Sequence, residues 1–268
     1  MNFFNSIIKK MSLPIDADVR QSEEDFNCPS HYRLIDDYVI KDGKPHPFAI
    51  VVPGGAYRFV ANFIEGKPIA QRLNEKGISA FIIYYRVKEE AQYPAPMDDL
   101  ARAVREIFDN LSKYNLDASN YSIWGSSAGG HLTASFGTDN MGYPKYKLPK
   151  PKALVLSYPV ITMDKKLTHK CSHDFLLGCE ATKEQEEFAS IEKHITKDYP
   201  PTYIWCGDID TTVHPDNTRI MANELQKVGV PVKIEIFPNV VHGVGPGTGT
   251  SAEGWINKAV DFWMSQTK

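Results

Sequence analysis

Short apolar segments alternate with amphipathic segments along most of this sequence, and this alternation is the feature that most restricts the fold. The apolar segments have strand length and lie at residues 48–52, 78–85, 121–124, 153–158, 202–206 and 232–237. Parallel strands joined by crossover helices produce such a pattern, because helices then cover both faces of the sheet. The sequence therefore predicts an α/β fold with a mostly parallel central sheet.

Helical segments are expected between these strands. In the clearest of these helical segments, apolar residues recur at the spacing of a single helix face. They are Leu100, Val104, Ile107, Phe108 and Leu111. Further helices are predicted at about residues 68–76, 216–228 and 253–264, and a glycine follows each of the first two. We expect strands and helices together to form one domain over residues 1–268.

Two segments depart from the alternation. Asp42 and Gly43 have the composition of a tight turn, which predicts a hairpin between two early antiparallel strands. Residues 162–199 are polar and far exceed the roughly 2 to 6 residues of a usual connection. They are interpreted as an inserted lid. Since ligands of such sheets bind at the carboxyl ends of the strands, this insertion is placed to shape a pocket.

Composition excludes several classes of protein. Hydrophobic residues make up 42% and charged residues 24% of the 268 residues, as in globular proteins. A net charge of −3 argues against nucleic acid as a partner. The lysines near the N-terminus follow an apolar stretch, unlike a secretory signal, and no apolar stretch is long enough for a membrane span. We expect a cytoplasmic protein without membrane partners.

The cysteine content indicates no disulfide framework. The four cysteines are Cys28, Cys171, Cys179 and Cys206. Cys171 and Cys179 lie near His169 and His173 in the sequence, and such residues can bind zinc. The spacing between them, however, matches none of the usual structural zinc sites. No metal and no cofactor is therefore expected.

The segment Gly-Ser-Ser-Ala-Gly at residues 125–129 reads G-x-S-x-G. It follows a predicted strand and precedes a helical segment, which is the strand, turn and helix context of a nucleophile elbow. The central position belongs to Ser127, not Ser126. Ser127 is the candidate nucleophile.

A second motif, Pro-Gly-Gly-Ala-Tyr at residues 53–57, follows the strand at residues 48–52. In this fold the loop after that strand supplies backbone N–H groups for the oxyanion, together with the residue after the nucleophile. The predicted donors are the N–H groups of Gly55, Ala56 and Ala128.

Candidates for the acid and the base come later in the chain. Asp208 and Asp210 follow the strand at residues 202–206, and His242 follows the strand at residues 232–237. The order Ser, Asp, His is that of α/β-hydrolases and of no other serine-hydrolase fold considered. Spacing alone leaves both aspartates open. The other histidines, such as His131 in the helix after the elbow, suit core or solvated roles better.

Gly-Ser-Ser-Ala-Gly-Gly-His-Leu at residues 125–132 resembles the esterase and lipase branch of α/β-hydrolases related to hormone-sensitive lipase. Within it, the chain is most similar to bacterial carboxylesterases of the acetyl-xylan or feruloyl esterase type, from about residue 45 onward. The resemblance implies that Asp210, three residues before Val213, is the acid. Pro53 and Ala56 depart from the His-Gly-Gly-Gly pattern of the family, but the backbone donors survive both changes.

The resemblance implies a serine carboxylesterase acting through Ser127, Asp210 and His242. Short acyl esters of sugars or small alcohols are the expected substrates, and Tyr57 and Phe59 are candidates to contact them. The expected partner is such a small-molecule ester, with self-association left open. Two alternatives stand beside this interpretation: a serine peptidase of the prolyl-oligopeptidase type, although its large extra domain is missing, and a non-catalytic hydrolase-fold receptor.

Overall fold

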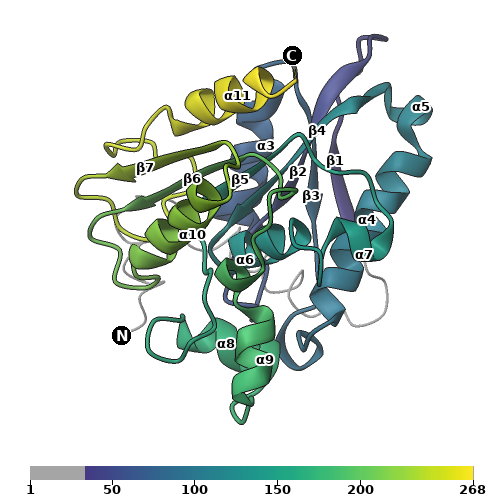
Figure 1. Cartoon of the computed structure of the whole chain (residues 1–268). Coiled ribbons are helices and arrows are strands. Elements are labelled where there is room, and N and C mark those ends of the chain that lie inside the picture. Colours follow the sequence, from purple (N-terminus) through teal and green to yellow (C-terminus); the bar gives the residue numbers. More distant parts are fainter. Residues whose placement is uncertain (1–33, 268) are drawn as a thin grey trace, which may run out of the picture. The chain divides into compact units, whose positions relative to one another are not determined.

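A seven-stranded sheet organises the computed structural model, which describes residues 34–267. The strands lie in the order β1-β3-β2-β4-β5-β6-β7 (Figure 1). Their bounds are β1 Ile35–Tyr38, β2 His46–Val52, β3 Ser79–Ile83, β4 Leu116–Ser126, β5 Ala153–Ser157, β6 Thr202–Gly207 and β7 Val232–Phe237. Strands β2 to β7 are mutually parallel, as the alternation predicts. The prediction for the N-terminal segment, and Cys28 with it, lies outside the described residues.

The predicted early hairpin is wrong. Strand β1 pairs antiparallel with β3, from Ile35 opposite Ile83 to Tyr38 opposite Ala80, so β3 separates it from β2. Asp42 and Gly43 do turn the chain, with Gly43 at a φ of 80°. The connection over residues 39–45 is long enough to cross over β3 to β2, a distance of two strand spacings of about 4.8 Å each. In that position β1 covers the edge of β3, whose five residues are all buried.

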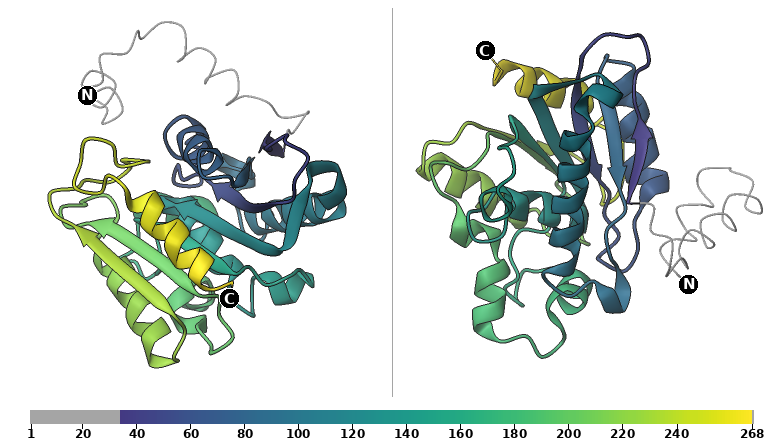
Figure 2. Two further views of the ribbon diagram at one scale, coloured as in Figure 1. Left: turned by 90° about the horizontal axis from the view of Figure 1, so that it is seen from above. Right: turned by 90° about the vertical axis from the view of Figure 1, so that its right-hand side faces the viewer.

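Helices cover both faces of the sheet, as Figures 1 and 2 show. One layer consists of α3 (Lys67–Asn74) and α11 (Trp255–Ser265); the other consists of α4 (Ala95–Asp109), α6 (Ser127–Phe136) and α10 (Asp216–Lys227). Strand β2 illustrates the division, because Phe48 and Ile50 belong to one hydrophobic cluster and Ala49 and Val51 to the other. This alternation follows from the two-residue period of a strand.

Shorter helices complete the chain. They are η1 (Asn62–Gly66), η2 (Lys88–Glu90), α5 (Leu111–Tyr114), α7 (Tyr143–Tyr146), α8 (Lys170–Leu177), α9 (Lys183–Ala189) and η3 (Ile191–His194). The helix predicted around Leu100 is α4, which ends at Asp109, so that Leu111 belongs to α5. Among residues 34–267, no helix is long and apolar enough to pass through a bilayer.

The insertion, residues 162–199, contains α8, α9 and η3, and Figure 1 shows α8 and α9 below the sheet. Most of its lysine and glutamate side chains are exposed or half-buried, whereas Ser172, His173 and Ser190 are buried. Hydrogen bonds and apolar contacts fix the insertion to the rest of the protein. The Tyr199 hydroxyl donates to the Ala134 carbonyl oxygen at 2.7 Å, and the Leu176 carbonyl oxygen accepts from the Tyr93 N–H at 2.9 Å. Leu176, Tyr199 and Ile191 are buried. The insertion is therefore packed against the body of the protein.

Candidate active site

Ser127 lies at the junction between β4 and α6, where the chain reverses from strand to helix. Its backbone is left-handed, with a φ of 54°. Such a conformation is costly for a residue with a Cβ and is found where function requires it. Gly129 makes the turn sterically feasible, because a Cβ there would lie 2.1 Å from the Val52 carbonyl oxygen. The predicted strand, turn and helix around Ser127 are all present.

A continuous line of hydrogen bonds joins three of the predicted residues. Nε2 of His242 lies 2.8 Å from the Ser127 Oγ, and Nδ1 lies 2.7 Å from an Asp210 carboxylate oxygen. Because a carboxylate only accepts, Nδ1 carries the ring proton and Nε2 accepts from the Ser127 hydroxyl. The other Asp210 oxygen accepts the N–H groups of Thr212 and Val213, at 2.9 and 3.0 Å. These bonds hold the carboxylate in line with the ring.

Asp208 has a different position. Its exposed carboxylate accepts the N–H of Asn239 at 2.6 Å and thereby links the loops that follow β6 and β7. Asp210 is buried and contacts His242. Of the two aspartates left open by spacing, Asp210 is the one in contact with the imidazole.

The loop after β2 brings the predicted oxyanion donors next to the nucleophile. A Cβ on Gly54 would lie 2.7 Å from the Cβ of Ser127, so the two segments are in close contact. The backbone from Gly55 to Tyr57 has positive φ throughout. Within residues 34–267, the N–H groups of Gly55, Ala56 and Ala128 enter none of the protein's own hydrogen bonds. They are free to donate hydrogen bonds to an anionic oxygen of a ligand.

The structure corrects the prediction for Tyr57. Its side chain has no exposed surface, and its hydroxyl donates to Nδ1 of His131 at 2.8 Å while its ring packs on Tyr85. A sugar ring has nothing to stack on there, so Tyr57 belongs to the core. The reason is the left-handed turn, which directs the side chain inward. Phe59 is half-buried and lies over Gly55, so it keeps a surface that a ligand can reach.

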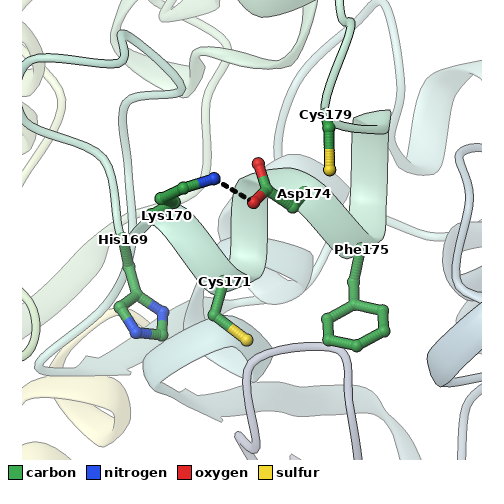
Figure 3. Close-up of a pocket in the computed structure, with 6 residues that line it drawn as sticks. All are labelled: His169, Lys170, Cys171, Asp174, Phe175 and Cys179. Atoms are coloured by element: carbon green, nitrogen blue, oxygen red, sulfur yellow. Dashed lines mark hydrogen bonds and ion pairs between the residues drawn. The ribbon is translucent and has the colours of Figure 1, made fainter.

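A pocket of about 580 Å³ lies along α8 in the insertion. Figure 3 shows His169, Cys171 and Phe175 directed to one side of this helix, while Lys170 and Asp174 pair with each other elsewhere. Burial lowers the pKa of His169, and the nearby charge of His242 adds to that effect. His169 therefore lies between the pocket and the candidate catalytic residues. Sequence reasoning assigned it a core or solvated role, because spacing does not reveal which way an insertion folds.

Two other residues near the site were not predicted from sequence. Glu65, in η1, is buried and accepts the N–H of Gly54 at 2.7 Å. The ring of Tyr158, directly after β5, lies 4.7 Å from that of His242. No motif surrounds either residue; an acidic residue eight positions past the oxyanion motif was the only available signal. Among the residues that the structure describes, no group of three His, Cys, Asp or Glu side chains is arranged to hold a metal ion.

A sequence model of the BD-FAE family matches residues 36–225, which include the oxyanion loop and the elbow. The chain belongs to the BD-FAE family. Endo-1,4-beta-xylanase B of Butyrivibrio fibrisolvens is 32% identical over 257 residues, which make up 91% of this chain and 40% of that protein. Acetylxylan esterase of Xylanibacter ruminicola is 31% identical over 212 residues, or 76% of this chain and 42% of that protein.

Solved structures agree with this membership. An acetyl ester-xyloside bifunctional hydrolase from Caldicellulosiruptor lactoaceticus superposes with a TM-score of 0.79 at 29% identity, covering 95% of this chain and 92% of that one. The resemblance to acetylxylan esterase-like α/β-hydrolases and the predicted fold are thus confirmed. This BD-FAE chain spans about two fifths of the length of the two curated relatives.

Proposed function

We propose that this protein is a serine carboxylesterase that hydrolyses acetyl and other short acyl esters of sugars. One observation carries the proposal: the hydrogen-bonded line from Asp210 through His242 to Ser127 ends beside three unused backbone N–H groups. Nucleophile, base, orienting acid and oxyanion donors are the four parts that acyl transfer by serine requires.

In this mechanism, His242 takes the hydroxyl proton as the Ser127 oxygen attacks the acyl carbon. Asp210 fixes the tautomer of the ring and stabilises the imidazolium. The N–H groups of Gly55, Ala56 and Ala128 donate to the oxygen that becomes negatively charged. His242 then returns the proton to the departing alcohol, leaving an acyl-serine, and a water molecule activated by the same base releases the acid.

The relatives support the substrate class. Two of them carry names that refer to acetylxylan or to an acetyl ester and a xyloside, and a third is named a xylanase. These names describe those proteins. Together they favour an acetylated sugar as the substrate class of this chain.

The decisive experiment compares wild type with Ser127→Ala on p-nitrophenyl acetate and on acetylated xylo-oligosaccharides. We expect wild type to release acetate from both, and the variant to lose a factor of about 10⁶ in kcat with unchanged thermal unfolding. A fluorophosphonate should label wild type at Ser127 only. Absence of labelling together with absence of ester hydrolysis would favour the receptor alternative, and cleavage of peptides in preference to esters would favour the peptidase.

A further inference from the structure

Glu65 is a buried carboxyl group beside the candidate catalytic residues, and the mechanism above does not use it. Only 4% of its surface is exposed, and within the described part of the chain it forms no ion pair. Its hydrogen bonds come from the N–H of Gly54, at 2.7 Å, and from the hydroxyl of Tyr158. Burying a carboxyl group is costly unless a function or a partner compensates.

Tyr158 connects Glu65 to the rest of the site. Its hydroxyl accepts the N–H of Gly245, in the loop after His242, at 3.1 Å, and also bonds to the Ser126 side chain in the elbow. Its ring packs edge-on against the His242 ring. Tyr158 is held in a left-handed backbone conformation, with a φ of 38°, which a non-glycine residue adopts only where its surroundings enforce it.

The geometry thus joins three loops at one carboxyl group. The Glu65 carboxyl group is hydrogen-bonded to the oxyanion loop through Gly54. Through Tyr158 it is linked to the elbow and to the loop that carries His242. A Cβ on Gly54 would be 2.7 Å from both the Glu65 carboxylate and the Cβ of Ser127, so the carboxyl group lies close to the nucleophile.

Few charged or titratable groups surround Glu65 and His242. Those that face His242 or Glu65 are Asp210, Tyr85, Tyr158 and His169. Burial raises the pKa of Glu65, while His242 and the two hydrogen-bond donors oppose that rise. Burial raises the pKa of both tyrosines, which keeps them neutral, and lowers that of His169. His242 is therefore the group near Glu65 that gains a positive charge during the proposed reaction.

We propose that Glu65 is a positioning residue that holds the oxyanion loop through Gly54 and, as a second carboxylate behind His242, favours the protonated imidazole. The proposal rests on the proposed function. It differs from a purely structural role in one respect: the charge of Glu65, and not only its hydrogen bonds, affects the protonation of His242.

Glu65→Gln separates the two roles, because its amide oxygen can still accept the N–H of Gly54 while the charge is lost. We expect kcat/KM for p-nitrophenyl acetate to fall about tenfold, and the acid limb of its pH profile to move to lower pH by about one unit. The direction follows because a base without the nearby negative charge stays neutral to lower pH. Tyr158→Phe is the matched control: it removes a hydroxyl but no charge, so the rate should fall with the acid limb unmoved.

A second readout is the pH dependence of Ser127 labelling by a fluorophosphonate, which requires no ester turnover. If wild type is labelled but hydrolyses no ester, the proposed function fails while Glu65 is still tested by the labelling profile. An acid limb that stays in place in Glu65→Gln, with folding confirmed by thermal unfolding, would overturn the inference. If Glu65→Gln does not fold, Glu65→Asp keeps the charge and should retain the wild-type limb at a reduced rate; a displaced limb would then contradict us.

Discussion

His131, on the helix that follows the nucleophile, donates its Nε2–H to the carbonyl oxygen of Ala189 in the insertion, at 2.9 Å. A carbonyl oxygen only accepts, so this bond fixes the tautomer, and Nδ1 accepts from the Tyr57 hydroxyl. One neutral ring thus ties together α6, the end of α9 and the oxyanion loop. Burial lowers the pKa of His131 to about 4, since a protonated ring there would lose the Tyr57 bond and its hydration.

The first prediction is an acid-dependent loss of stability through His131. In the unfolded chain its pKa is about 6.5, so between pH 6.5 and pH 4 the unfolded state binds more protons than the folded one. Stability must then fall as pH falls through this window, by on the order of 3 kcal/mol from this group. Urea unfolding of wild type and His131→Gln at pH 7 and pH 4 measures it.

We expect His131→Gln to be less stable than wild type at pH 7 but to lose less stability on acidification, because glutamine does not titrate. Other buried groups, Glu65 among them, contribute equally to both proteins and cancel in the difference. Equal losses in the two proteins would show that His131 is not the titrating group.

The second prediction separates the two aspartates. Asp210→Asn should lower kcat by about 10⁴, because an amide stabilises the wrong tautomer of His242. Asp208→Asn is the matched control, since its amide oxygen can still accept the N–H of Asn239 and nothing joins it to the imidazole. Steady-state rates on p-nitrophenyl acetate decide between them. A reversed order would transfer the orienting role to Asp208.

The third prediction concerns the closeness of Gly54 to the nucleophile. In Gly54→Ala the new methyl group would lie 2.7 Å from the Cβ of Ser127 and 2.8 Å from the backbone oxygen of Ser126, so the oxyanion loop must move. Displacing one donor costs about 10² to 10³ in kcat. Gly43→Ala is the control: Gly43 precedes β2, far along the strand from the oxyanion loop, and has a positive φ but open space around a Cβ. This variant should lose about 1 kcal/mol of stability through backbone strain and keep the wild-type kcat. Equal kcat values in the two variants would contradict this reading of the loop.

Much of this architecture could be predicted from the sequence, because it is encoded locally. Apolar segments of strand length and the glycines around Ser127 specify backbone conformations within a few residues. Chain order then limits which aspartate and which histidine can reach the carboxyl ends of neighbouring strands. These signals led to β2 through β7, the elbow, and the residues that lie in line with Ser127.

Contacts between distant segments were not predicted, and each failure has a physical cause. Sequence does not state which edge of the sheet β1 joins, so a turn at Asp42 looked like a hairpin. Tyr57 was expected to contact the substrate, but its left-handed backbone directs the side chain into the core, where it is buried. Glu65 contacts Gly54 and Tyr158 only after η1 folds back over the loop, and no local pattern marks that contact.

The last prediction is the acyl-chain preference. The buried apolar side chains of the insertion, Leu176, Ile191 and Tyr199, pack against the body of the protein, so they are not available to line a long acyl tunnel. Each further CH₂ group adds about 0.8 kcal/mol of binding only where such a lining exists. Along a series of p-nitrophenyl esters, kcat/KM should therefore peak at about two to four carbons and decline toward octanoate. The fall should appear mainly in kcat, because a long acyl chain that no tunnel encloses bends the ester out of line with Ser127. A kcat/KM that rises steadily through eight carbons would mean that the insertion opens an apolar channel, and would shift the proposed substrate from acetylated sugars to lipid-like esters.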